Sequence, residues 1–317
     1  MSAPTNTVVS TQVGVREDLE DIIYRVVAEE TPFLANIGKV KVKNRYHEWQ
    51  TESLASPDAT NAALEGDDVG THGAANATTR VGNRTQIFTK SGLVSGTAEV
   101  VDTAGRASEL ARQKLLKGKE IVRDMEARFI GNYASVAESG ATTGKSAGAL
   151  AWITSNDSRG ASGADGGFSG GTVSAATNGT QRTFTEALFK AMLATAFSNG
   201  SKFSQAYMGP THKQQFSAFT GIADIRSDAP GKKMATIIGG ADVYVSDFGN
   251  ITLIPHAYGL TRDCLVVDPE MWAVGTLRPL FTQELAKTGD NLRFQMIAEK
   301  LLVCKNEKGG GVVADLP

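Results

Sequence analysis

One stretch of the chain comes close to a motif with known chemistry. Residues 139–146 read Ser-Gly-Ala-Thr-Thr-Gly-Lys-Ser, which resembles a phosphate-binding loop. That motif needs a glycine where Ser139 stands and a strand before it, because a tight turn must aim backbone N–H groups at the phosphates. A helical pattern precedes Ser139 instead. We therefore interpret the stretch as a loop leaving a helix, with an NTPase centred on Lys145 as the alternative.

Other groups capable of chemistry lack the partners that their chemistry requires. Asp247-Phe248-Gly249 matches the magnesium-binding tripeptide of kinases, but no catalytic His-Arg-Asp accompanies it, so it reads as a hairpin turn. The histidines lack the i,i+4 spacing of a metal-binding helix; they are His47, His72, His212 and His256. No nucleophile lies at a useful spacing from a base. We expect no catalytic residues, no cofactor and no metal site, and hence no enzyme.

The two cysteines and the overall composition narrow the class of protein. Cys264 and Cys304 lie in apolar, strand-like surroundings and read as buried small side chains. Two cysteines exclude a disulfide scaffold. The 317 residues carry a net charge of -2, which argues against a protein that wraps nucleic acid. No signal peptide and no membrane-spanning run is apparent, so we expect synthesis in the cytoplasm and no membrane contact.

Alternation of apolar and polar residues predicts a long hairpin arm in the first third of the chain. Residues 39–51 and 83–94 alternate as strands do. Between them, residues 55–82 contain only three large aliphatic side chains, Leu64, Val69 and Val81. A long loop without a core is usually functional or disordered, and an isolated hairpin is marginal in water. We therefore expect the arm to lie against another subunit.

Helical periodicity and glycine content predict the elements of the remaining chain. Residues 16–30 predict an amphipathic helix after a polar arm, and a longer helix is expected from a cap at Asp102-Thr103 to about Glu138. Its length suggests a spine laid across a sheet. Many of the 34 glycines fall within residues 141–182. Further predicted elements are a helix over 183–198, a strand at 206–209 leading into a helix at Pro210, a hairpin over 242–255, strands after 264, and a short tail after Gly309-Gly310-Gly311. The fold class is α+β.

Several stretches resemble one family of tailed-bacteriophage major capsid proteins. The resemblance extends from about Val13 to Leu316 and rests on the residues that follow. They are Glu30-Thr31-Pro32-Phe33-Leu34, Ile37-Gly38, Tyr46-His47-Glu48-Trp49-Gln50-Thr51, residues 242–249, Asp268-Pro269-Glu270-Met271-Trp272-Ala273-Val274, Leu277-Arg278-Pro279 and residues 285–290.

This resemblance implies the tailed-phage (Hong Kong 97-type) major capsid fold and names for its parts. Residues 1–38 would be the N-terminal arm and 39–100 the E-loop hairpin arm. Residues 101–149 would form the P-domain spine helix and its exit, 150–255 the A-domain, and 256–317 the P-domain C-terminal strands and tail. The implied function is the structural subunit of an icosahedral head, made in the host bacterial cytoplasm and located in the virion.

The resemblance also implies partners. Copies of the chain would form hexamers and pentamers that enclose double-stranded DNA without sequence-specific binding. Because the match begins near residue 13, a separate scaffolding protein is expected, together with a portal and a possible decoration protein. We expect subunit contacts at hairpin-arm residues, namely Trp49, Leu64, Glu65, Asp67, Asp68, Val69, Arg80 and Arg84.

Two interpretations of particular features stay open beside the favoured ones. The acidic residues Glu65, Asp67 and Asp68 can form a calcium site, although an acidic tip that meets an arginine of a neighbouring subunit is favoured. The same architecture can also build the shell of a cellular encapsulin-like nanocompartment around cargo enzymes.

Overall fold

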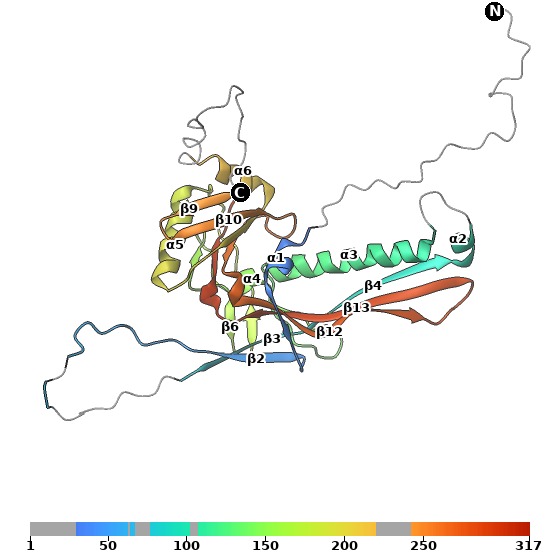
Figure 1. Ribbon diagram of the computed structural model, residues 1–317, viewed down its shortest axis with the longest axis horizontal. Helices are drawn as coiled ribbons and strands as arrows, with labels where there is room; N and C mark the ends of the chain where they lie inside the picture. The colour runs from blue at the N-terminus through green and yellow to red at the C-terminus, as the bar shows by residue number, and fades with distance from the viewer. Residues whose placement is uncertain (1–29, 63, 67–76, 102–106, 220–241) are drawn as a thin grey trace, which may run out of the picture.

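Two β-sheets and one long helix organise the computed structural model, which describes residues 30–62, 64–66, 77–101, 107–219 and 242–317. A four-stranded sheet has the order β1-β12-β13-β4, and a six-stranded sheet has the order β5-β14-β11-β8-β10-β9. A separate two-stranded arm, β2–β3, projects away from both sheets (Figure 1). The predicted α+β class is confirmed.

The four-stranded sheet carries the spine helix. Its strands are β1 (Gly38–Lys41), β12 (Trp272–Leu285), β13 (Asn291–Cys304) and β4 (Gln86–Ser95). Helix α3 (Glu109–Ile130) lies along β4 and β13 (Figure 1). Phe129 of α3 meets Phe88 of β4 edge-on, with ring centroids 5.7 Å apart. One face of this sheet is therefore buried beneath the helix.

The spine helix is shorter than its sequence pattern predicts. It begins at Ser108, whose hydroxyl accepts the Ala111 N–H at 3.1 Å, and it ends at Ile130 rather than near Glu138. The predicted cap at Asp102-Thr103 lies outside the described residues. After Ile130 the chain is extended, and the Arg128 guanidinium donates to the carbonyls of Ala134 and Ser146, both at 2.8 Å. The chain around Ser146 therefore crosses the end of the helix and takes the place of another turn.

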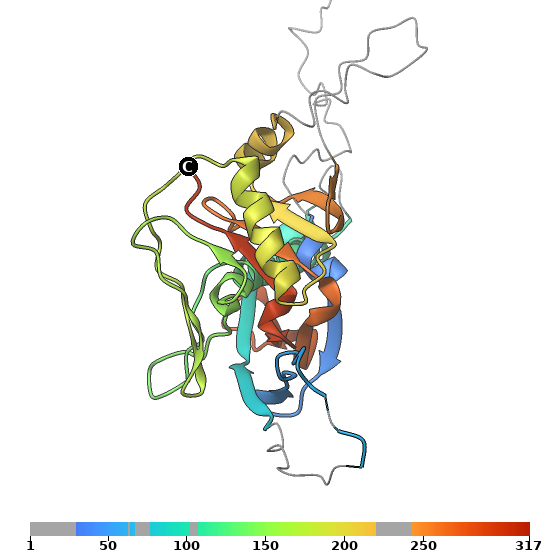
Figure 2. The ribbon, with the colours of Figure 1, turned by 90° about the vertical axis from the view of Figure 1, so that its left-hand side faces the viewer.

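The six-stranded sheet is buried on both faces near its centre. Its strands are β5 (Asp157–Ser158), β14 (Gly310–Val313), β11 (Cys264–Val267), β8 (Gln205–Met208), β10 (Gly249–Pro255) and β9 (Val243–Ser246). Helices α5 (Glu186–Ser198) and α6 (Pro210–Ser217) contribute to the apolar cluster on one face (Figure 2). The other face shares a core with Phe33 and Trp272. The predicted 183–198 helix, the strand and helix around Pro210, and the 242–255 hairpin are confirmed.

The predicted hairpin pairing is correct only at its outer part. Strand β2 (Tyr46–Thr51) pairs with β3 (Thr79–Arg84), as expected of an arm. However, β1 pairs with β12, and β4 pairs with β13 along its whole length. Period-two patterning identifies a strand but not its neighbour, because both partners satisfy the same alternation. The projecting arm is therefore residues 46–84.

The segment after the glycine run, predicted as a tail, is an interior strand. β14 lies between β5 and β11, and Val312 and Val313 are fully buried. A Cβ at Gly311 would stand 2.7 Å from the Met192 sulfur, and one at Gly310 would stand 2.9 Å from the Trp272 ring. These glycines are required by close packing rather than by a flexible linker.

The remaining elements are short. They are α1 (Pro32–Asn36), α2 (Gly96–Val100), α4 (Ala149–Trp152), β6 (Gly167–Ser169), β7 (Thr172–Ser174) and the 3-10 turns Pro269–Met271 and Glu307–Gly309. The helix predicted over 16–30 lies almost wholly outside the described residues. None of the helices in the described ranges has the length and apolar character needed to cross a membrane.

Candidate assembly surfaces

An aromatic row fastens the base of the arm to the body. Trp49 of β2 lies opposite Val81 of β3, and its ring centroid is 5.6 Å from that of Trp152. Trp152 in turn stacks on Phe168 at 6.0 Å. Beyond Thr51 the outgoing chain is exposed at every residue through position 62. The arm is thus held at its base while its outer part has no packing within the described subunit.

A cavity of about 590 Å³ opens where the arm leaves the body. Leu54 and Val81 line it from the arm, and Trp152, Phe168 and Lys308 line it from the body. Leu54 is 90% exposed, and the buried Trp152 indole N–H has no hydrogen-bond acceptor among the described residues. The cavity therefore lies between the base of the arm and the body, with apolar and polar side chains in its lining.

The predicted interface residues divide into an anchored and an exposed group. Trp49 is partly buried at the arm base, and Arg84 stacks 4.7 Å from the centroid of the Tyr46 ring. Arg80 is exposed and pairs with Glu48 at 3.1 Å. Leu64, 79% exposed, and Glu65 lie at the tip. Asp67, Asp68 and Val69 lie outside the described residues, so the calcium interpretation at these acids is not addressed.

A second surface is the face of the four-stranded sheet that turns away from α3. Phe88 points toward α3, so its neighbours Ile87 and Thr89 point to the opposite side. Pairing across the strands places Thr89, Ile297 and Phe281 in one row. Ile87 is 44% exposed and Phe281 38%. This part of the outer sheet face is partly exposed, whereas Leu301 and Val303, farther along β13 on the same face, are buried in a cluster with Val42 and Trp49.

An ion pair borders the outer sheet face. The Arg278 guanidinium donates to Glu299 at 2.8 Å, and the Thr85 hydroxyl donates to the other oxygen of that carboxylate at 2.8 Å. Glu299 is only 4% exposed. Both carboxylate oxygens of Glu299 therefore accept hydrogen bonds, and this polar pair lies beside the row formed by Thr89, Ile297 and Phe281.

Asn83 fixes the direction in which the arm leaves the body. The side chain is fully buried, and its amide nitrogen donates to the Leu302 carbonyl at 2.7 Å and to the Ser146 hydroxyl at 3.2 Å. Its amide oxygen accepts the Ala147 N–H at 3.0 Å. Asn83 thereby joins the arm, the loop after the spine and strand β13. Sequence reasoning missed it, since a lone asparagine in a strand pattern carries no such signal.

Glu126 fastens the first described helix to the spine. It is fully buried, and its carboxylate accepts the N–H groups of Phe33 at 2.8 Å and Leu34 at 2.9 Å. The His256 Nε2 lies 2.8 Å from the same carboxylate. Side chains of α3 and of the residue following β10 therefore hold the start of α1. The apolar periodicity of α3 places Glu126 next to the buried side of the helix. It does not indicate which groups the carboxylate binds.

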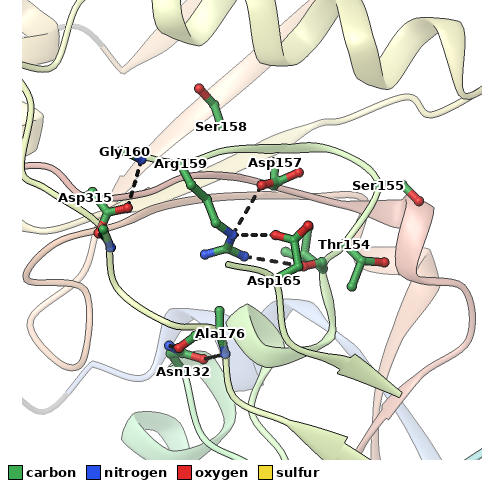
Figure 3. A network of polar contacts seen from close by, with 12 residues as sticks. Asn132, Thr154, Ser155, Asp157, Ser158, Arg159, Gly160, Asp165, Ala176 and Asp315 are labelled. Atoms are coloured by element: carbon green, nitrogen blue, oxygen red, sulfur yellow. Dashed lines mark hydrogen bonds and ion pairs between the residues drawn. The ribbon is translucent and has the colours of Figure 1, made fainter. Parts of the chain in front are cut away.

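Asp315 clamps the glycine-rich region (Figure 3). One carboxylate oxygen accepts the Gly160 N–H at 2.9 Å, and the other accepts the Gly179 N–H at 2.7 Å. Arg262 pairs with it at 3.1 Å. Asp315 adopts a left-handed backbone conformation with φ 61°. One buried side chain thus closes both ends of the excursion between 160 and 179 against the six-stranded sheet.

Beside that clamp, carboxyl groups crowd around Arg159 (Figure 3). The guanidinium lies 3.2 Å from Asp157 and 2.6 Å from Asp165. Burial raises the pKa of Asp157, and the neighbouring Asp165 raises it further. Burial also raises the pKa of Asp263 to about 6, against the opposing effect of Arg159. This part of the molecule therefore responds to mild acidification.

The residues considered for catalysis have structural roles where they are described. The Ser146 hydroxyl, which a phosphate-binding loop would direct at a metal ion, is buried and accepts the Leu302 N–H at 3.1 Å. Lys145 pairs with Val136 in an isolated bridge, so the loop is a turn-back and not a phosphate cradle. Asp247 lies in the turn between β9 and β10, as expected of a hairpin.

The three described histidines and both cysteines are likewise dispersed or buried, and His72 lies outside the described residues. Burial lowers the pKa of His47 and of His212, whose Nε2 lies 3.1 Å from the Pro317 carbonyl. Burial raises the pKa of both thiols, Cys264 and Cys304, which keeps them unreactive. Within the described ranges, no three His, Cys, Asp or Glu side chains are grouped so that they can hold a metal ion.

Comparisons with known proteins point to one class. The family model described as "SU10 major capsid protein" matches residues 3–317. A major capsid protein of Escherichia phage Phieco32 is 37% identical over 126 residues, which are 40% of this chain and 36% of that protein. The chain thus matches little more than a third of the length of that relative.

Solved structures share the fold at low sequence identity. The capsid asymmetric unit of cyanophage A-1(L) aligns with a TM-score of 0.68 and 11% identity, covering 95% of this chain and 97% of that one. The holo-SrpI encapsulin complex of Synechococcus elongatus PCC 7942 aligns with a TM-score of 0.58 and 8% identity, covering 95% and 92%. The resemblance to the tailed-phage capsid fold, expected from the sequence, is confirmed.

Proposed function

The chain belongs to the SU10 major capsid protein family, and on this premise we propose that it is the structural subunit of an icosahedral bacteriophage head. The family match over residues 3–317 carries the proposal. The role is structural and not catalytic, since the side chains once considered for catalysis serve packing and hydrogen bonding. The subunit forms pentamers and hexamers that enclose double-stranded DNA and is located in the virion.

The named parts of a capsid subunit can be assigned to the elements. The E-loop within residues 39–100 corresponds to the projecting arm β2–β3. The P-domain consists of α3 and the four-stranded sheet, with 101–149 and 256–317 as its main segments. The A-domain, 150–255, supplies α5, α6 and most strands of the six-stranded sheet. Residues 1–38 form the N-terminal arm, which α1 and Glu126 tie to the spine.

Assembly gives the arm the packing that it lacks in one subunit. The exposed chain beyond Thr51 makes no packing contacts within the described part of the subunit. Ordering its backbone therefore costs roughly 1–2 kcal/mol of conformational free energy per residue. Permanent interfaces that bury on the order of 2,000 Å² or more can offset such a cost. We assign the outer sheet face of a neighbouring subunit as the surface that receives the arm, because its apolar row is partly exposed. Arm residues Trp49, Arg80 and Arg84, with Leu64 and the acidic tip, then form this contact.

Partners beyond the subunit itself follow from the family. A separate scaffolding protein directs curvature, a portal occupies one vertex, and a decoration protein can bind the outside. The interior wall contains DNA without gripping particular sequences, which suits a net charge of -2.

Particles isolated from the cells that make this chain test the proposal. Negative-stain microscopy should show closed polyhedral shells, and nuclease-protected double-stranded DNA of genome length should be present. Shells filled with protein cargo would instead indicate an encapsulin-like compartment, whose fold this chain also resembles. A solitary monomer, with no shells at any stage, would overturn the proposal.

A further inference from the structure

One edge of the four-stranded sheet carries a concentrated positive charge. In β1 and the residues after it, Lys39, Lys41 and Lys43 are exposed and alternate with Val40 and Val42. Val42 is 3% exposed and packs in a cluster with Ala273 and Leu301. Since alternate side chains point to opposite sides of a strand, the three lysines share the side turned away from that cluster.

A fourth lysine joins them from strand β13. Lys41 is paired with Thr276 of β12, and Thr276 is paired with Lys300 of β13. Paired residues of neighbouring strands share a face, so Lys300 lies in the same row as Lys41. Burial lowers the pKa of Lys300, and the positive charge of Lys39 lowers it further. We call these four residues, Lys39, Lys41, Lys43 and Lys300, the lysine face.

The lysine face has no anionic partner within the described part of the chain. None of its four ammonium groups makes an ion pair or hydrogen bond with another described residue. The next cation along the chain behaves differently, because Arg45 pairs with Glu138. Like charges held together without a counter-charge repel one another. A polyanionic partner is therefore the occupant that this surface fits.

The chain itself supplies a matching polyanion. Residues 17–30 include one arginine, Arg25, and six acids, which are Glu17, Asp18, Glu20, Asp21, Glu29 and Glu30. The sequence predicts an amphipathic helix there, which would be about 20 Å long at ~1.5 Å per residue. Lys39 to Lys43 spans about 13 Å of strand at ~3.3 Å per residue. The two charged segments are comparable in length.

The connection between the two segments favours docking within one chain. Only the five-residue helix α1 and its flanking residues separate Glu30 from Lys39. Glu126 holds the start of α1 in place, so the acidic segment ends at a fixed point a few residues before Lys39 in the chain. A short tether gives an effective concentration in the mM range, well above that of a separate partner in solution.

We propose that the acidic segment 17–30 docks on the lysine face of its own subunit and neutralises it. The inference concerns one subunit and does not depend on whether the subunits form a shell. Its consequence is that the lysines are closed to other polyanions, including nucleic acid, while the segment is docked. A chain with four unpaired clustered lysines thereby avoids non-specific attachment to DNA.

Zero-length carbodiimide cross-linking of the full-length protein tests the contact directly. Mass spectrometry should find amide links between the lysine face and the acids of residues 17–30 at 50 mM salt. These links should be lost at 1 M salt, where the Debye length is about 3 Å. Mixing ¹⁵N-labelled and unlabelled protein distinguishes the chains, and links confined to one isotope support the proposal. Links only between copies, or none at the lysine face, overturn it.

Binding of a short DNA duplex provides a second readout. The full-length variant Glu17→Gln, Asp18→Asn, Glu20→Gln, Asp21→Asn should bind the duplex at least tenfold more tightly than the unaltered protein at 50 mM salt. Adding Lys39→Gln, Lys41→Gln and Lys43→Gln should remove that gain. The matched control adds Lys145→Gln, Lys202→Gln and Lys287→Gln instead, which are exposed lysines elsewhere, and should retain the gain.

The DNA experiment also has an outcome that favours a different occupant. If the unaltered protein already binds the duplex, and the three lysine-face substitutions abolish this binding, the lysine face is open to nucleic acid. That result would overturn docking by the acidic segment. Circular dichroism of each variant excludes loss of the fold as the cause of a change in binding.

Discussion

At the scale of single residues, Glu126 joins three parts of the chain with one carboxylate. It accepts two N–H groups at the start of α1 and faces His256. Water cannot replace these partners, because the side chain is 0% exposed. Such a group contributes through its partners, and removing it leaves buried donors without an acceptor.

Glu126→Gln should therefore lower the free energy of unfolding by about 2–4 kcal/mol, in the range found when a buried pair loses one member. The amide can accept from Phe33 or Leu34 but cannot serve both donors and His256 together. Urea denaturation of the dissociated subunit measures the loss. Glu120→Gln on the same helix is the control, since Glu120 pairs with Lys117 near the surface and should cost under about 1 kcal/mol. Equal losses in both variants would contradict the role given to Glu126.

Asp263 makes stability depend on pH. Burial raises its pKa from 3.8 to about 6, so the folded protein binds this proton more tightly than the unfolded chain. The stabilising contribution is fully present below pH 3.8 and is lost as the pH rises through about 6. The raised pKa of Asp157 acts in the same direction.

Asp263→Asn should raise the free energy of unfolding at pH 7.5 by about 1–3 kcal/mol, because roughly two pKa units correspond to that range. Near pH 5 the difference from the unaltered protein should fall to roughly half, since the carboxyl is then protonated in the folded protein but still ionised in the unfolded chain. Denaturation curves at both pH values measure this. Asp247→Asn, in an exposed turn, should show no comparable change. A pH-independent effect of Asp263→Asn would refute the assignment.

At the scale of elements, two glycines in regular structure have opposite roles. Gly118 lies inside α3, where an added Cβ would make only an ordinary contact with Met296 at 3.5 Å. Gly311 lies inside β14, where a Cβ would stand 2.7 Å from Met192 and 2.9 Å from Phe203. Gly118→Ala should stabilise the subunit by about 0.5–1 kcal/mol through helix propensity. Gly311→Ala should destabilise it by about 1–3 kcal/mol through overpacking.

Thermal denaturation of the two variants side by side checks these signs. The same substitution made twice controls for the change in unfolded-chain entropy, which is similar at both positions. If both variants shift the melting temperature in the same direction, the prediction that close packing around Gly311 excludes a Cβ is wrong. Gly118→Ala also tests whether the spine needs to bend, since a stabilised spine should still assemble if it acts as a rigid rod.

Element types followed from the sequence more readily than their limits and partners. The hairpin at 242–255 and the helix ending at Ser198 have local turn and capping signals, and both were predictable. The end of α3 was not, because Tyr133 and Val136 continue the apolar spacing past Ile130. The helix ends where another segment crosses it, and the Arg128 guanidinium binds the Ser146 carbonyl of that segment. Contacts between distant segments leave no trace in local periodicity.

At the scale of the whole molecule, the outer arm should matter to assembly and not to folding. Deleting residues 55–78 keeps both strands, since β2 ends at Thr51 and β3 starts at Thr79. The described part of this loop is exposed, so its removal should change the free energy of unfolding by less than about 1 kcal/mol. Electron microscopy should nevertheless show no stable shells. Normal shells from the shortened chain would show that the arm is dispensable.

The family, fold and arm were predictable from motifs that are contiguous in sequence. Trp49 lies in such a motif and Arg84 in the predicted arm strand, and the structure places both at the arm base. The outer sheet face and the polar residues that orient the arm were not identified. Asn83 meets Ser146 and Leu302 across much of the chain, and that grouping exists only after folding. The sequence therefore predicted the projecting arm, whereas the outer sheet face proposed to receive it could be recognised only in the folded subunit.

The interior position of β14, next to the edge strand β5, has a consequence for how the protein is made. Residues 310–313 lie between β5, near residue 157, and β11, near residue 265. The six-stranded sheet remains split until this strand emerges from the ribosome, so a nascent chain cannot present a finished surface to its neighbours. We therefore expect subunit assembly to wait for synthesis of this strand, and a polypeptide that ends before residue 310 to be sensitive to proteases.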